Sequence, residues 1–152
     1  MKNLTVKPSQ LITREFAKEL NLNYTHKRAK LIHKSTKRED ANAIWYSLEA
    51  LESYIDYIKT HGADTGYDVD GIRFYFGVYP DDEKHGEKAG LTTLFLTATG
   101  KKTASETEAN SNKIQSFVMA QEESSQEESS SDIESIEPMN YGNIGRPPSL
   151  IY

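Results

Sequence analysis

Two runs of alternating apolar and polar residues, Gly71–Tyr79 and Leu91–Thr99, constrain the fold more than any other feature of this 152-residue chain. Alternation with a period of two is typical of a strand that buries one of its faces. The residues that join the two runs, Pro80–Gly90, are polar and glycine-rich, and they are too few for a crossover helix. We therefore expect the two strands to pair antiparallel.

A helix is predicted just before the first strand, at Leu48–His61. Ser47 is suited to cap its N-terminus, and Gly62 is suited to a left-handed exit. A short strand is predicted upstream at Ile44–Tyr46. The apolar residues of the helix recur at steps of three and four and form one stripe: Leu48, Leu51, Ile55 and Ile58.

Two further helices are predicted nearer the N-terminus, around Leu11–Leu20 with Ser9 as the cap, and at Thr25–Lys34. Helices that come first, followed by paired strands, indicate an α+β fold rather than alternating βαβ units. The expected architecture is a set of N-terminal helices packed on a small, mainly antiparallel sheet.

An acidic tract of serine and glutamate, QEESSQEESSSDIES at Gln121–Ser135, interrupts the globular pattern. Such a composition has too little apolar surface to offset the entropy of ordering, which favours a disordered insert. The pattern then becomes globular again at PMNYGNIGRPPSLIY. We therefore predict a core at residues 1–100, an acidic insert at 101–137 and a segment at 138–152 that docks back on the core.

Charge and composition exclude several classes of function. The net charge of -5 argues against general affinity for nucleic acid, and the absence of cysteine excludes disulfides and thiolate chemistry. No apolar run approaches the length of a membrane helix, and the N-terminal residues lack the apolar stretch of a secretory signal. A cytoplasmic location without a membrane partner is the expectation.

The second face of the predicted sheet is the candidate binding surface. If Ile72, Phe74, Phe76 and Val78 pack on the Leu48–Ile58 stripe, the intervening side chains point the other way. Tyrosine and arginine are common anchors of recognition surfaces because they combine rigid area with polar tips. We call this set the tyrosine face: Arg73, Tyr75, Tyr79 and Phe95. It predicts a non-catalytic module that binds a protein or peptide, unless the N-terminal helices or Tyr141–Tyr152 cover it.

Two alternative functions stay open. A small enzyme could use an acid–base site at the 81–90 loop, built from His85, Asp81 or Asp82, and Arg73. Weak nucleic-acid binding could use the basic stretch at residues 26–38, although its charges spread around a helix rather than along one stripe. Ten of the first 40 side chains are basic and four are acidic.

No metal or cofactor is expected from the motifs. Asp64, Asp68 and Asp70 suggest a calcium loop, but the positions where that loop needs further carboxylates are Gly66 and Gly77. Metalloprotease, Walker and dinucleotide-binding patterns are absent from the sequence.

The segments WYSLEALESYI, GIRFYFGVYP and TLFLTATG, with the closing NYGNIGRPP, carry a family resemblance. Together they resemble a set of small uncharacterised bacterial proteins with a similar helix-then-strand core. The resemblance covers about residues 40–100 and the closing motif. It implies the same α+β core and transfers no activity or catalytic residue.

Overall fold

Two long antiparallel strands, β2 (Tyr67–Val78) and β3 (Thr92–Lys102), form the centre of the computed structural model, which describes residues 6–103 and 130–145. Their register runs from Val78 opposite Thr92 to Tyr67 opposite Lys102. The predicted antiparallel pairing is confirmed. The connection between the strands contains a short 3₁₀ segment, η2 (Glu83–Lys88).

Both strands are longer than predicted, and in β2 a bulge between Val69 and Gly71 interrupts the alternation. A bulge adds one residue and reverses which side chains face a given side. Tyr67 and Val69 therefore share with Ile72 the side of the sheet that packs on the core. The change of phase explains why the alternating pattern of the sequence begins only at Gly71.

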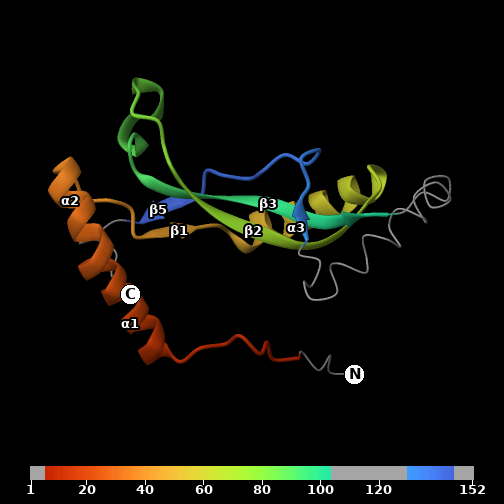
Figure 1. Cartoon of the computed structure of the whole chain (residues 1–152), viewed down its shortest axis with the longest axis horizontal. Coiled ribbons are helices and arrows are strands. Elements are labelled where there is room, and N and C mark those ends of the chain that lie inside the picture. The colour runs from red at the N-terminus through yellow and green to blue at the C-terminus, as the bar shows by residue number, and fades with distance from the viewer. Residues whose placement is uncertain (1–5, 104–129, 146–152) are drawn as a thin grey trace, which may run out of the picture.

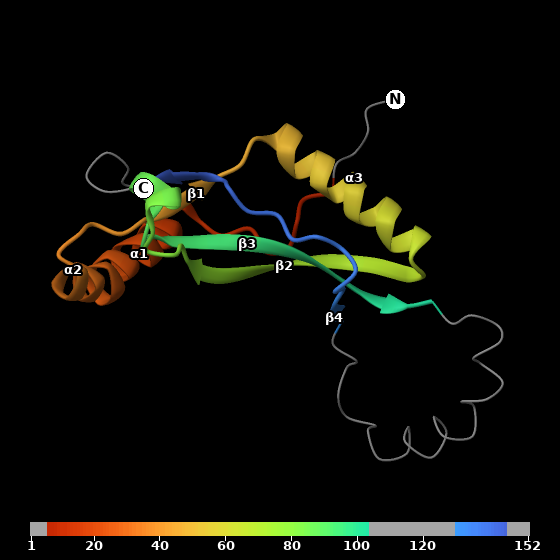
Figure 2. The same cartoon turned by 90° about the horizontal axis from the view of Figure 1, so that it is seen from above.

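The helix α3 (Leu48–Asp64) packs on this side of β2 and β3 (Figure 2). Its start is confirmed, since the Ser47 hydroxyl accepts a hydrogen bond from the backbone N–H of Ala50 at 3.0 Å. The predicted exit at Gly62 is wrong, because the helix continues to Asp64. Gly62 is buried instead, and a Cβ at this position would lie 2.3 Å from Val69 Cγ2. The glycine permits close approach of helix and strand.

The chain after the acidic tract completes the core. Strand β4 (Ser131–Asp132) pairs with β3 at Gly100 and Thr99, giving the sheet order β2-β3-β4. Beyond it, the segment runs beside β3 and makes a further bridge between Met139 and Leu96 (Figure 2). Six buried residues form the core cluster: Tyr54, Ile58, Leu96, Ala98, Ile133 and Ile136.

These contacts correct the limits of the predicted insert. Lys101 and Lys102 belong to β3, and residues 130–137 contribute β4 and two buried isoleucines. Residues 104–129 lie outside the described residues. In the C-terminal segment, β5 (Asn143–Gly145) pairs antiparallel with β1 (Ala43–Trp45), while residues 146–152 lie outside the description.

The N-terminal helices extend away from the sheet (Figure 1). The first, α1 (Arg14–Tyr24), begins later than predicted because Thr13 is its cap: the Thr13 hydroxyl accepts from the N–H of Phe16. It continues through a π-helical turn, η1 (Thr25–Ala29), into α2 (Lys30–Thr36). We call residues 6–38 the arm. The fold is therefore α+β, with α3 as the helix that packs on the central strands.

One packing prediction is wrong. Phe74, Phe76 and Val78 were expected beneath the helix, but their exposed fractions are 55%, 84% and 67%. The physical reason is length, because α3 lies along only one end of the β2–β3 pair (Figure 2), and the β2 residues that pack against the core are Tyr67, Val69 and Ile72. We call these three exposed residues the apolar row.

The core assignment predicts the effect of two substitutions within α3. Ile58 is 2% exposed and Leu48 is 77% exposed. Ile58→Ala should lower the free energy of unfolding by about 2–4 kcal/mol, because it leaves a cavity against the sheet. Leu48→Ala should change it by less than about 0.5 kcal/mol. Equal effects in urea denaturation would contradict the assigned core.

Candidate binding surfaces

The tyrosine face is bound by the protein's own C-terminal segment. Arg73 Nη1 lies 2.6 Å from Asp132 Oδ1, and Arg73 Nη2 donates to the Ser130 carbonyl at 2.9 Å. The Tyr75 hydroxyl donates to the other Asp132 oxygen. Across the strands, Tyr75 stacks on Phe95 with 5.1 Å between ring centroids. The structure thus brings Arg73, Tyr75 and Phe95 together and fastens them to β4.

The electrostatics of this cluster favour the charged guanidinium. The neighbouring Tyr75 hydroxyl, followed by the Asp132 carboxylate, raises the pKa of Arg73. Because the Arg73 and Asp132 side chains are both substantially solvent-exposed, water screens the pair and limits what it adds to stability. Its main effect is to set the position of the segment that follows Ser130.

Tyr79 differs from the expectation of an open anchor, because it is only 6% exposed. Its hydroxyl donates to Asn140 Oδ1 at 2.6 Å, and the Asn140 amide donates to the Leu94 carbonyl at 2.6 Å. The ring also stacks on Tyr141 with centroids 6.3 Å apart. Residues 133–145, which we call the closing segment, therefore cover this end of the tyrosine face through Asn140 and Tyr141.

The proposed acid–base trio at the 81–90 loop is not assembled. His85 Nδ1 lies 2.6 Å from Asp82 Oδ1, and the same oxygen accepts from the backbone N–H of His85. The hydrogen bond to His85 lowers the pKa of Asp82. Arg73 instead binds Asp132, and Asp81 lies near Arg38 beside a different hollow. The Asp82–His85 pair is a helix cap at the start of η2.

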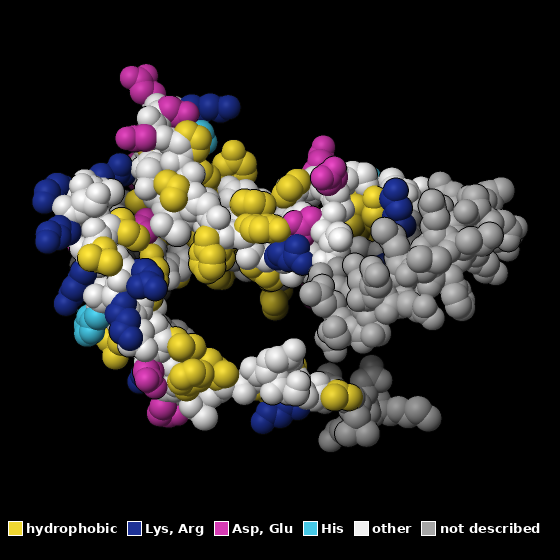
Figure 3. All heavy atoms as spheres, in the orientation of Figure 1, with side chains coloured by type: hydrophobic (Ala, Val, Ile, Leu, Met, Phe, Trp, Pro, Cys, Tyr) yellow, Lys and Arg dark blue, Asp and Glu magenta, His cyan; other side chains and the backbone are white. Residues whose placement is uncertain are grey.

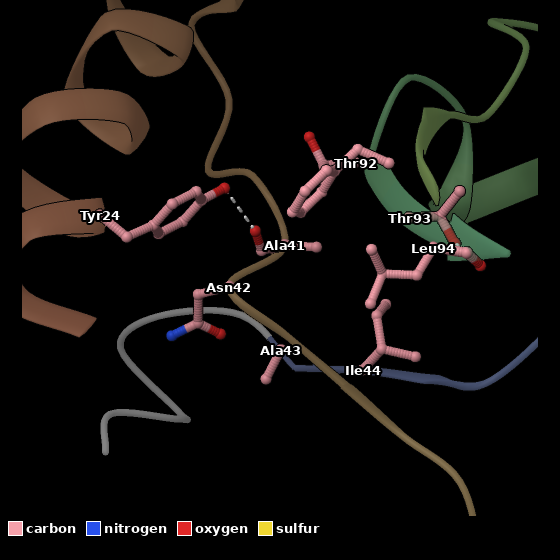
Figure 4. Close-up of a pocket in the computed structure, with 9 residues that line it drawn as sticks. Tyr24, Ala41, Asn42, Ala43, Ile44, Thr92, Thr93 and Leu94 are labelled. Carbon is pink, nitrogen blue, oxygen red and sulfur yellow. Dashed lines mark hydrogen bonds between the residues drawn. The ribbon is translucent and has the colours of Figure 1, made fainter. Parts of the chain in front are cut away.

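A cavity of about 180 Å³ lies where the arm joins the sheet (Figure 4). Its lining is mostly apolar and comes from α1, from β1 and the linker before it, and from β2 and β3. The residues that line it are Tyr24, Ala41, Asn42, Ala43, Ile44, Phe76, Thr92, Thr93 and Leu94. Phe76 therefore connects the cavity with the apolar row.

The arm is fixed at this cavity by Tyr24. Its hydroxyl donates to the Ala41 carbonyl at 3.0 Å and lies 3.2 Å from Asp40 Oδ2 (Figure 4 shows the first bond). Asp40 is buried, and its other oxygen accepts from the N–H of Thr92 on β3 at 2.7 Å. Burial, followed by the Asp40 carboxylate, raises the pKa of Tyr24 to about 12.

The apolar row and the cavity are the surface that the sequence did not predict. The three residues alternate correctly for a buried face, so their pattern alone indicated core. The row lies on β2, which is an edge strand in the order β2-β3-β4, so its outer edge has no strand partner within the described sheet. Exposed apolar side chains on an open edge mark a place where another chain can dock.

Comparison with known protein families, with curated protein sequences and with solved structures finds no match to this chain. The resemblance to small bacterial proteins therefore stays a prediction. In residues 6–103 and 130–145, no group of three or more potential metal ligands is placed to hold an ion. No helix in those same ranges is long and apolar enough to cross a bilayer.

The anchoring role of Asp132 can be tested by hydrogen exchange. Asp132→Asn removes the charge that Arg73 binds, so the segment after β4 should open more often. We expect amide exchange at Ile133 and Ile136 to accelerate a few-fold, as suits a partly solvated ion pair. Glu134→Gln, on an exposed side chain of the same segment, is the matched control. Unchanged exchange in the Asp132 variant would contradict the anchor.

The environment of Tyr24 can be tested by titrating tyrosine absorbance at high pH. The difference between wild type and Tyr24→Phe should be centred near pH 12 rather than near 10. Because folding raises this pKa, the Tyr24 contacts stabilise the fold fully below about pH 10 and are lost as the pH rises through about 12. A difference curve centred near pH 10 would mean that the hydroxyl is solvated.

Proposed function

We propose that the protein is a non-catalytic protein-interaction module whose docking surface is the apolar row with its neighbouring cavity. The observation that carries the proposal is the exposure of Phe74, Phe76 and Val78 on an open edge strand. Burying three such side chains against a partner would release about 1.5–3 kcal/mol for each. The Tyr24-lined cavity beside Phe76 offers a recess for an apolar anchor.

The docking surface is placed here rather than on the tyrosine face for a physical reason. Arg73 and Tyr75 already bind Asp132, and Tyr79 is buried beneath the closing segment. A partner on that face would have to replace these internal bonds, whereas none of residues 6–103 and 130–145 covers most of the apolar row. The tyrosine face then acts as the anchor of the C-terminal segment.

The chemistry of the surface supports binding rather than catalysis. The apolar row contains no acid, base or nucleophile, and the Asp82–His85 pair caps η2. The proposal includes work in the cytoplasm, with which a chain that forms no disulfide is compatible.

Photocrosslinking in the native cell tests this function. A photoreactive phenylalanine analogue at position 76 should become linked to a protein, because a docked partner lies within reach of this side chain. The same analogue at Glu52, an exposed position of α3, is the control and should give no specific product. A folded protein that gives no protein crosslink from position 76 would refute the docking surface.

A further inference from the structure

The arm presents an amphipathic helix that nothing in the described structure covers. Phe16 and Leu20 lie one turn apart on α1, and each is about half exposed. No residue of α1 is buried. Although α1, η1 and α2 together form one continuous helix, most of the stability of a helix in a protein comes from packing of its apolar face. The arm therefore needs a surface to pack on.

The sheet also has an apolar surface without cover in the described structure. The apolar row is exposed, and the outer edge of β2 is unpaired within the described sheet. Figure 3 shows an open gap between the sheet and the arm, with hydrophobic side chains on both of its sides. Each side of the gap thus has an exposed apolar surface on which the other kind of surface could pack.

The chain's own arm does not close this gap. Tyr24 is hydrogen-bonded at the middle of the arm to Ala41 and lies next to Asp40, which fixes the direction of the helix. Lys37, with φ of 60°, then ends α2 in a left-handed turn. With both of these points fixed, α1 stands away from the β2 face of its own chain (Figure 1).

The uneven distribution of charge along the chain indicates which kind of partner the arm would attract. The first 40 residues carry ten basic and four acidic side chains, whereas the next 60 carry four basic and ten acidic ones. The basic excess of the arm comes mainly from residues 27–38, because α1 itself carries two basic and two acidic side chains. This basic part of one arm is attracted to the acidic body of another molecule, whereas two such arms or two bodies repel each other. In a two-fold symmetric dimer the contact is reciprocal, so the arm of each copy packs on the body of the other.

We propose that the partner is a second copy of this chain, with the arms exchanged about a two-fold axis. The apolar side chains of each α1, Phe16 and Leu20, pack on the apolar row of the other copy. This inference rests on the proposed function and names its partner.

The first test is the mass in solution, measured by light scattering on the purified full chain. The wild-type protein should have twice the mass of one chain. Phe16→Glu/Leu20→Glu in the arm and Phe76→Glu in the sheet should each weaken the dimer about tenfold or more. Leu48→Glu, which changes an exposed apolar residue outside both surfaces, should leave the dimer intact. A monomeric wild type would overturn the inference.

The second test identifies which surfaces meet, and it uses the absence of native cysteine. Leu20→Cys protein mixed with Phe76→Cys protein should form a disulfide between chains under mild oxidation. Leu20→Cys mixed with Leu48→Cys is the control and should form far less. A double variant, Leu20→Cys/Phe76→Cys, that forms its disulfide within one chain would overturn arm exchange.

The two proposals fail in different ways. A monomer whose position 76 crosslinks to a different protein refutes the second copy but supports the docking surface. A monomer without any crosslink from position 76 refutes both. Crosslinking of position 76 to residues 146–152 of its own chain would likewise overturn both, because that segment would then cover the row.

Discussion

The packing of α3 on the two central strands depends on residues that come from the far side of the acidic tract. Ile133 and Ile136 are among the most deeply buried side chains of the structure, and they contact a helix that ends about 70 residues earlier. The Tyr54 hydroxyl shares its proton between the carbonyls of Leu96 and Glu137, at 3.0 and 3.2 Å. One phenol thus connects helix, strand and closing segment in a single buried contact.

This arrangement explains how so small a sheet acquires a core. Two strands and one helix leave the β3 edge open, and the segment after Ser130 closes it through β4 and the bridge at Met139. The other edge, at β2, receives no such cover in the described residues. The sheet therefore has one covered edge, at β3, and one open edge, at β2, and the open edge is where the proposed partner would bind.

The sequence predicted the parts of the fold that depend on local pattern. The Ser47 cap, the body of α3 and the antiparallel pairing follow from short-range spacing, and all three are confirmed. What it could not predict depends on how far one element extends along another in three dimensions. Nothing in the alternation of Phe74 and Phe76 shows that α3 stops short of them.

The site was predicted less well for the same reason. The partners of Arg73 and Tyr79 come from residues 130–140. The polar composition of this segment gives no indication that two of its isoleucines are buried. Residues so distant in sequence leave no periodic signal at the positions they cover. Similarly, the direction of the arm depends on the contact of Tyr24 with Ala41, which no local motif indicates.

The pairing of Gly100 with Ser131 has a consequence for how this chain can vary. It holds the two ends of the intervening connection side by side on neighbouring strands, so the fold requires only that the connection close. For loops in general, the entropic cost of closure grows with the logarithm of the length, and each doubling costs only about 0.6 kcal/mol. Insertions and deletions between those ends are therefore nearly free, and natural variation in length should concentrate there while β3 and the closing segment stay constant.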